Sequence, residues 1–207
     1  MPNQYAFPWG VYIGDFVTAE ANIPVCLDSR QGGFCVLFDD NSESVANNFI
    51  ENIALKLFEV LPAEAICVDI FDFSQRKRFN HLFALKQDKL YQVVRTVDEA
   101  TKLFNRLELL GFQCHDLLSS GMNISQYNQQ SEFPEQYHLL LLNLDHYPND
   151  IAPLKRFKEF LSSAYDAGFY CIAFGKQSLL HNKDKATQFI LNHLPHISLK
   201  KQAIQPK

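Results

Sequence analysis

The chain has 207 residues, of which 47% are hydrophobic and 20% are charged. This length and composition are typical of one globular domain and exclude a disordered chain. Its 19 basic and 23 acidic residues give a formal net charge of −4, so it has no excess of positive charge to attract nucleic acid unaided. No signal peptide and no run of about 20 apolar residues is evident, and we expect a cytoplasmic protein.

The cysteines and histidines are scattered along the chain. The five cysteines lie mostly in apolar runs and form no CxxC pair, so we expect reduced, buried thiols; they are Cys26, Cys35, Cys67, Cys114 and Cys171. The closest histidine pair, His193 and His196, has no matching cysteine or carboxylate set. The sequence therefore predicts no metal site.

Short apolar runs predict the strands of a sheet. Runs that are apolar on both faces are typical of buried, parallel strands with helices on either side. The predicted strands span residues 34–38, 65–71, 91–95, 138–144, 169–174 and 196–199.

Helical patterns alternate with these strands. Residues 45–58 carry apolar side chains three and four apart. Thr96 and Glu99 have capping-box spacing at the start of a second helix, and a third begins with Pro153 in its first turn and ends before Gly168.

The alternation of strands and helices predicts a three-layer α/β fold with a mainly parallel sheet and right-handed crossovers. We expect a single domain, in which residues 1–33 form a small β appendage, residues 34–200 the α/β core and residues 201–207 a tail. The polar stretch 119–136 is predicted to be an irregular surface excursion.

Several stretches, in this order, resemble the motor domain of FtsK/HerA-type ATPases, a family of DNA-translocating and secretion proteins with a RecA-like P-loop fold. They are IPVCLDSRQGGFCVLFDDNSESVANNFIENIALKLFEVLPAEAICVDIFD, FNHLFALKQDKLYQVVRTVDEATKLFNRLELLGF, ISQYN, HLLLLNLDHYP and FLSSAYDAGFYCIAFGKQSLLHNKDKATQFILNHLPHISL. The order and spacing of these stretches carry the resemblance, because each stretch alone is common in α/β proteins.

The stretch after the first core strand departs from a working phosphate loop. The motif G-x-x-x-x-G-K-[ST] supplies glycines that let backbone N–H groups wrap phosphates, a lysine that neutralises them and a hydroxyl that holds Mg²⁺. At these positions the chain reads Asp39, Asp40, Asn41, Ser42, Glu43, Ser44, Val45 and Ala46. Val45 therefore takes the lysine position and Ala46 the hydroxyl position.

Three carboxylates stand where a polyphosphate would bind. Like charges 4 Å apart repel by about 1 kcal/mol in water and about 4 kcal/mol at an effective dielectric constant near 20. The alternative interpretation of Asp39, Asp40 and Glu43 is that they cap a helix, because acids complement the dipole at a helix N-terminus. Either interpretation opposes ATP binding.

The resemblance also implies roles for residues at later strand ends. Asp145 takes the place of the Mg²⁺-binding aspartate, whereas His146 replaces the glutamate that orients the attacking water. Gln177 resembles the family's sensor glutamine, and Asp72 matches the acidic residue after the second strand. Purely structural alternatives stay open, since Asp145 suits a turn before Pro148 and Asp72 suits a structural role at its strand end.

Other chemistries have weaker support. The sequence contains no G-x-S-x-G elbow, no G-x-G-x-x-G loop and no H-E-x-x-H motif. Its best basic cluster is Arg76, Lys77 and Arg78, which is either a weak nucleic-acid contact or a solvated loop.

These observations lead to a hypothesis and two alternatives. The hypothesis is a catalytically inactive FtsK/HerA-like domain that serves as an interaction or assembly module in a DNA-processing, translocation or secretion complex. It expects no cofactor, and its partner would be an active motor ATPase or a second copy. The alternatives are an enzyme that binds nucleotide and Mg²⁺ through Asp145 with Asp39 or Asp40, and a small nucleic-acid-binding accessory protein.

Overall fold

A computed structural model describes residues 5–8, 10–17, 21–28, 32–86, 88–148 and 150–199. The predicted tail, residues 201–207, lies outside the described residues, as does part of the predicted appendage. Among the described helices, none combines the length and the apolar character that crossing a bilayer requires.

A six-stranded sheet forms the centre of the molecule. Its strands are β3 (Gly33–Phe38), β4 (Ile66–Phe71), β5 (Tyr91–Val94), β6 (Tyr137–Asn143), β7 (Phe169–Lys176) and β8 (His196–Leu199). They are ordered β5-β4-β6-β7-β3-β8, and every pairing is parallel. The inner strands are buried on both faces, which explains why their sequences are continuously apolar rather than alternating.

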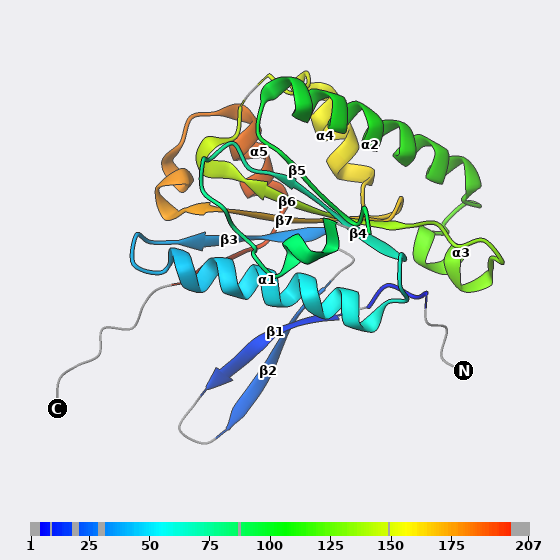
Figure 1. Cartoon of the computed structure of the whole chain (residues 1–207), viewed down its shortest axis with the longest axis horizontal. Helices are drawn as coiled ribbons and strands as arrows, with labels where there is room; N and C mark the ends of the chain where they lie inside the picture. Colours follow the sequence, from blue (N-terminus) through cyan, green and yellow to red (C-terminus); the bar gives the residue numbers. More distant parts are fainter. Residues whose placement is uncertain are drawn as a thin grey trace.

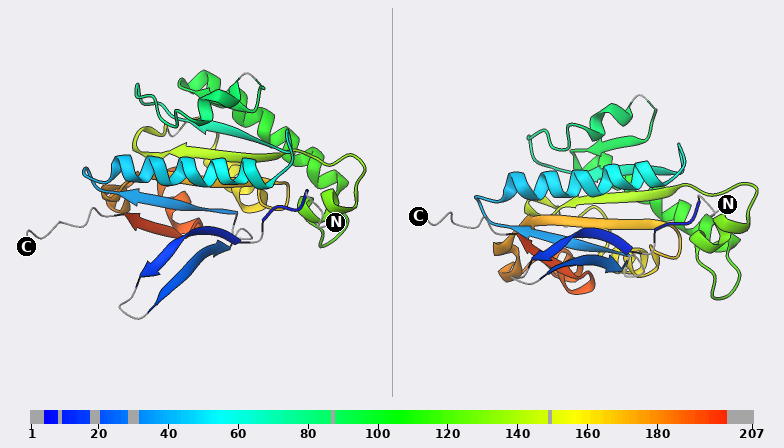
Figure 2. Two further views of the ribbon diagram at one scale, coloured as in Figure 1. Left: turned by 60° about the horizontal axis from the view of Figure 1, so that its bottom comes forward. Right: turned by 90° about the horizontal axis from the view of Figure 1, so that it is seen from below.

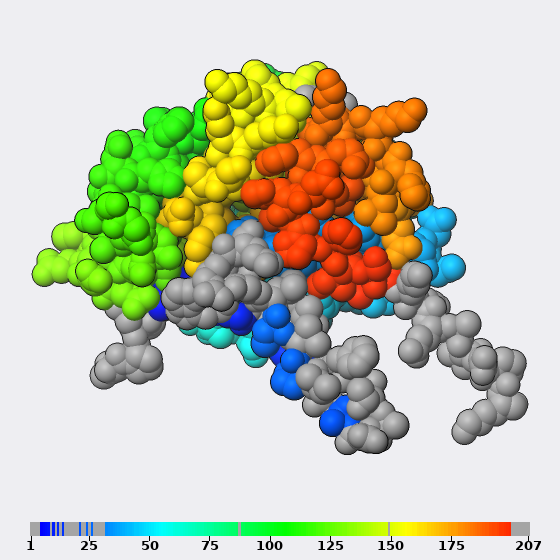
Figure 3. Space-filling view, turned by 180° about the vertical axis from the view of Figure 1, so that it is seen from behind, coloured from blue at the N-terminus to red at the C-terminus, as the bar shows by residue number. Residues whose placement is uncertain are grey.

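Helices cover both faces of this sheet, and Figure 1 shows α1 on one side and α2, α4 and α5 on the other. They are α1 (Glu43–Val60), α2 (Val97–Leu117), α3 (Ile124–Gln130), α4 (Leu154–Ser163) and α5 (Lys185–His193), with 3-10 turns at η2 (Leu82–Lys86), η3 (Leu144–His146) and η4 (Gln177–His181). Figure 3 shows α4 and α5 side by side. The predicted three-layer α/β class is confirmed.

Aromatic side chains join the helices on the second face. The ring of Phe104 on α2 packs edge-on against Phe160 of α4, with centroids 5.3 Å apart. Phe157 of α4 contacts the ring of Phe189 on α5 at 6.5 Å. Edge-to-face pairs at these distances add to the stabilisation from burial alone.

The N-terminal appendage is a hairpin of β1 (Gly10–Val17) and β2 (Asn22–Asp28), which pair antiparallel as a separate sheet. Figure 2 shows it extending away from the six-stranded sheet. Residues before the hairpin reach the core, because Phe7 is buried and the hydroxyl of Tyr137 donates to the carbonyl of Tyr5 at 2.7 Å.

The structure corrects two expectations. Residues 119–136 are not wholly irregular, because α3 forms inside them with a capping box between Asn123 and Gln126. The thiols are not all buried, because Cys26 on the hairpin is exposed. The predicted core strands and the capping box at Thr96 and Glu99 are confirmed.

Candidate functional site

The carboxyl ends of four neighbouring strands meet at one edge of the sheet. Asp72 follows β4, Asn143 ends β6, Lys176 ends β7 and Asp39 follows β3. In open parallel α/β sheets, ligands bind outside this edge. Topology therefore brings together the strand-end residues that the sequence singled out in separate stretches.

The turn from β3 to α1 closes on itself. Asn41 N–H donates to Asp39 Oδ1 at 3.0 Å, and Asp39 N–H donates to Ser42 Oγ at 3.0 Å. The Ser42 hydroxyl lies 2.7 Å from Asp39 Oδ1 and 2.9 Å from the carbonyl oxygen of Leu199, either of which accepts its proton. These bonds tie the turn internally and to the end of β8.

The helix begins early relative to a phosphate loop. In the motif alignment Glu43 and Ser44 are the last two loop positions, yet α1 starts at Glu43. Four residues, 39–42, therefore make the whole connection. Val45, at the lysine position, is exposed, and Ala46, at the hydroxyl position, is fully buried.

The expectation that acids cap this helix holds in part, because Glu43 lies in its first turn, whereas no carboxylate caps its backbone. Ser42 occupies the N-cap without a side-chain capping hydrogen bond, and Asp39 caps the turn rather than the helix. Glu43 instead accepts hydrogen bonds from two arginines, Arg76 Nη1 and Arg78 Nη1, each at 2.8 Å. Burial raises the pKa of Glu43, but the hydrogen bonds and charges of Arg78 and Arg76 outweigh burial, and its pKa is lowered.

Arg78 extends this group toward β4. Its side chain is 6% exposed, and Nε lies 3.3 Å from Oδ2 of the buried Asp72. Asp72 accepts a hydrogen bond from Asn143 Nδ2 at 2.8 Å. The guanidinium lies over the ring of Phe174, 5.7 Å from its centroid. Buried charges need such pairing.

Of the predicted basic cluster, then, Arg78 is an internal residue and Arg76 is exposed but paired with Glu43. Lys77 between them is exposed. The nucleic-acid interpretation of these three residues stays a prediction.

Asp145 and Asp40 meet through Lys176. Asp145 Oδ1 accepts from the backbone N–H of Lys176 at 2.8 Å, and Lys176 Nζ lies 2.6 Å from Asp40 Oδ1. The hydrogen bond to Asp40 and the charge of Asp40 raise the pKa of Lys176. His146 is exposed in η3, and Gln177 begins η4 directly after Lys176.

Sequence reasoning missed three participants at this edge. Lys176 and Asn143 carry no motif, because each acts through a residue on a neighbouring strand. Leu199 contributes a backbone carbonyl, which no side-chain pattern can reveal. Sequence reasoning also predicted no metal site, but Cys67, Asp69 and His138 lie together within 4.8 Å elsewhere on the sheet.

Comparison with known proteins rests on structure. No protein-family model matches the sequence, and no curated protein matches it. The cytoplasmic domain of the type VII secretion ATPase EccC from Thermomonospora curvata superposes with a TM-score of 0.67 at 15% identity, over 98% of this chain and 23% of that one. This chain has a RecA-like α/β fold.

Two further structures share the RecA-like fold. EssC (ATPases 2 and 3) from Geobacillus thermodenitrificans superposes with a TM-score of 0.65 at 14% identity, over 93% of this chain and 37% of that one. The pCW3 conjugation coupling protein TcpA, with ATPγS, gives 0.61 at 19% identity, over 92% of this chain and 54% of that one. The chain spans about half or less of the length of these three proteins.

Proposed function

We propose that this RecA-like domain does not hydrolyse ATP and serves as an assembly module in a secretion or DNA-transfer complex, with a protein partner. The observation that carries the proposal is the four-residue turn between β3 and α1. A phosphate loop needs a longer backbone path to direct several N–H groups at phosphate, and here two of its positions are already helical.

Electrostatics supports the same proposal. Asp39, Asp40 and Glu43 add negative charge around the turn, and the nearby arginines Arg76 and Arg78 are engaged with Glu43 and Asp72. A nucleoside triphosphate at this edge would have to separate these ion pairs. Leaving a buried charge unpaired costs about 3–5 kcal/mol, which a weak phosphate contact does not offset.

The proposed partner class comes from the proteins that share the fold. EccC is a secretion ATPase, and its ATPases 2 and 3 have been described in complex with a signal sequence peptide. TcpA is a conjugation coupling protein. We infer that this domain also works beside other protein subunits, either an active motor or a second copy.

Nucleotide binding is tested by calorimetry and thermal denaturation with Mg²⁺ and ATP, and turnover by phosphate release. We expect no heat of binding, no change in melting temperature and no turnover. Turnover that disappears in Asp145→Ala would overturn the proposal and favour the nucleotide-dependent enzyme.

The assembly role has a separate test. The domain is titrated into a purified motor ATPase from the same cell. The motor is chosen because its phosphate loop contains the lysine. We expect a saturable change in the motor's ATP turnover, with complex formation measured by light scattering. If the domain neither self-associates nor affects any such motor, the assembly role is rejected. The nucleotide result would still stand.

A further inference from the structure

A second group of chemically active side chains lies away from the strand-end edge. Cys67 and Asp69 are two residues apart on β4 and therefore share one face of the sheet. His138 on β6 is directly paired with Cys67 in the parallel ladder. All three are buried, with 8%, 2% and 8% of their surfaces exposed in the order Cys67, Asp69, His138.

Two ligand atoms face the same ring nitrogen. Cys67 Sγ lies 3.1 Å from His138 Nδ1, and Asp69 Oδ2 lies 2.9 Å from it. A neutral ring nitrogen has either one hydrogen or one lone pair, so it forms one well-aligned hydrogen bond with one of these atoms and only a weak or bifurcated one with the other. The arrangement also differs from a nucleophile–base–acid relay, in which the two partners contact opposite ring nitrogens.

A cation between the three atoms satisfies all of them. Zinc binds thiolate sulfur at about 2.3 Å and imidazole nitrogen or carboxylate oxygen at about 2.0–2.2 Å, which places tetrahedral ligand atoms roughly 3.2–3.6 Å apart. The third separation here, from Cys67 Sγ to Asp69 Oδ2, is 3.9 Å. Each of the three separations is within about 0.5 Å of this tetrahedral range.

Neighbouring groups orient the ligands. Arg106 on α2 lies 3.5 Å from Asp69 Oδ1 and donates to Gln92 Oε1 at 2.9 Å. It therefore engages the carboxylate oxygen that faces away from His138. The ring of His138 stacks on Phe169, with centroids 5.0 Å apart. Contacts of this kind fix the position of metal ligands.

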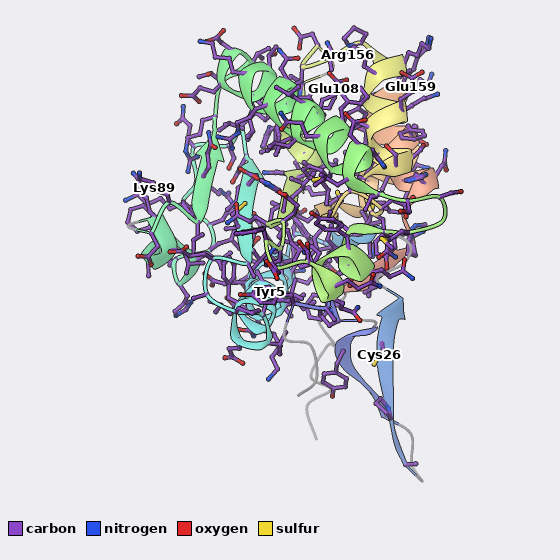
Figure 4. The ribbon with its side chains drawn as sticks, turned by 90° about the vertical axis from the view of Figure 1, so that its right-hand side faces the viewer. Tyr5, Cys26, Lys89, Glu108, Arg156 and Glu159 are labelled. Carbon is purple, nitrogen blue, oxygen red and sulfur yellow. The ribbon has the colours of Figure 1, made fainter. Side chains whose placement is uncertain are left out.

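A cavity of about 310 Å³ lies beside the three ligands, which is ample room for water. Besides the three residues, its lining includes Lys89, Gln92, Arg106 and Cys114. Figure 4 labels Lys89 at the side of the molecule where β5 lies. Water in this cavity is available as a fourth ligand, the arrangement of zinc sites with three protein ligands.

We propose that Cys67, Asp69 and His138 bind one divalent transition-metal ion, for which zinc suits the mixed sulfur, nitrogen and oxygen donors, with water from the cavity as the fourth ligand. The site lies toward the start of β4, whereas Asp72 and the strand-end edge follow its last residue. It is therefore independent of the proposed loss of ATP hydrolysis.

The test uses the untagged full chain, loaded with Zn²⁺ or with Co²⁺ as a coloured probe. Metal is counted by mass spectrometry after dialysis, and the cobalt form is examined for a thiolate-to-cobalt charge-transfer band. We expect one ion per chain and a thiolate band. Cys67→Ser should abolish the band, and both Cys67→Ser and His138→Gln should lower affinity at least about tenfold. Cys114→Ser is the matched control, since its thiol lines the same cavity, and it should keep both.

Circular dichroism establishes whether each variant folds. If Cys67→Ser does not fold, the wild-type chain still decides the question, because its ion count and its thiolate-to-cobalt band are measured without any variant. Absence of a stoichiometric ion, a cobalt spectrum without the thiolate band, or a band that persists in Cys67→Ser would each overturn the proposal.

Discussion

Arg78 Nη1 lies 2.8 Å from Glu43 Oε1, so an arginine from the segment after β4 reaches the first residue of α1. In a RecA-like fold that helix start faces bound phosphate. Here Glu43, the first residue of that helix, is paired with Arg76 and Arg78. This pair links the fold to the proposed loss of ATP hydrolysis.

Removing Arg78 should destabilise the protein strongly. Arg78→Met leaves the buried carboxylate of Asp72 without its cation, and we expect the free energy of unfolding to fall by about 3 kcal/mol. Urea denaturation measures it. Lys77→Met, at the exposed neighbouring position, is the control and should change stability by less than about 0.5 kcal/mol. A loss no larger than that of Lys77→Met would show that the ion pair is not structural.

Acid should weaken the same pair. Because the pKa of Glu43 is lowered in the folded state, Glu43 contributes stability that is fully present above its unfolded pKa and is lost as the pH falls through the folded pKa. Stability should therefore decrease below the ordinary value of 4.5. Glu43→Gln should show a smaller decrease over that window in urea titrations at stepped pH. An identical pH profile for both proteins would contradict this assignment.

Restoring two side chains should not restore ATP hydrolysis. Val45→Lys combined with Ala46→Ser supplies the missing lysine and hydroxyl, but the four-residue turn still lacks a backbone path around phosphate. We expect no phosphate release above the unmodified chain. Val45→Lys alone is the control for folding, since Val45 is exposed. Turnover in the double variant would mean that side chains, not the turn, had blocked catalysis.

Gly33 should tolerate no side chain. Its φ is 142°, and a Cβ there would lie 1.8 Å from the carbonyl oxygen of Cys171 on β7. We expect Gly33→Ala to lower the free energy of unfolding by about 3 kcal/mol or more. Gly14 has the same φ with nothing within 4 Å of its Cβ position, so Gly14→Ala isolates the backbone strain and should cost less. Thermal denaturation compares the two variants.

Thiol labelling should distinguish the exposed cysteine, Cys26, from the buried ones. Cys26 lies on the protruding hairpin (Figure 4), whereas Cys35, Cys114 and Cys171 are buried. Burial raises the pKa of Cys35 to about 12 and that of Cys114 to about 11, so their thiolate forms are scarce near neutral pH. We expect Cys26 to react first with a thiol reagent and the buried thiols to react on unfolding. Mass spectrometry of labelled peptides identifies each site, and early labelling of Cys35 would contradict the burial of β3.

The candidate site was predicted in part. The pattern of strand ends identified Asp39, Asp72 and Asp145, because residues that follow buried parallel strands reach one sheet edge. Their actual partners were not predictable. Lys176 contacts Asp40 across 136 positions of sequence, and no local pattern encodes such a separation.

The metal-ligand group shows the same limit. Cys67 and His138 are 71 residues apart and become neighbours through the register of β4 against β6. Ligand spacing along the chain predicts a metal site where a turn or a helix brings the ligands together. It cannot predict one where strand pairing does so.

The sequence by itself determined the layered fold. Continuous apolar runs are typical of strands buried on both faces, and helical periodicity is typical of helices buried on one face. The sequence also predicted that Val45 and Ala46 stand at the lysine and hydroxyl positions of a phosphate-loop motif. Tertiary structure alone decided that the turn at residues 39–42 is closed, that Arg78 is internal, and that Cys67, Asp69 and His138 converge. Each of these depends on strand order and register, which arise from packing between segments distant in the chain.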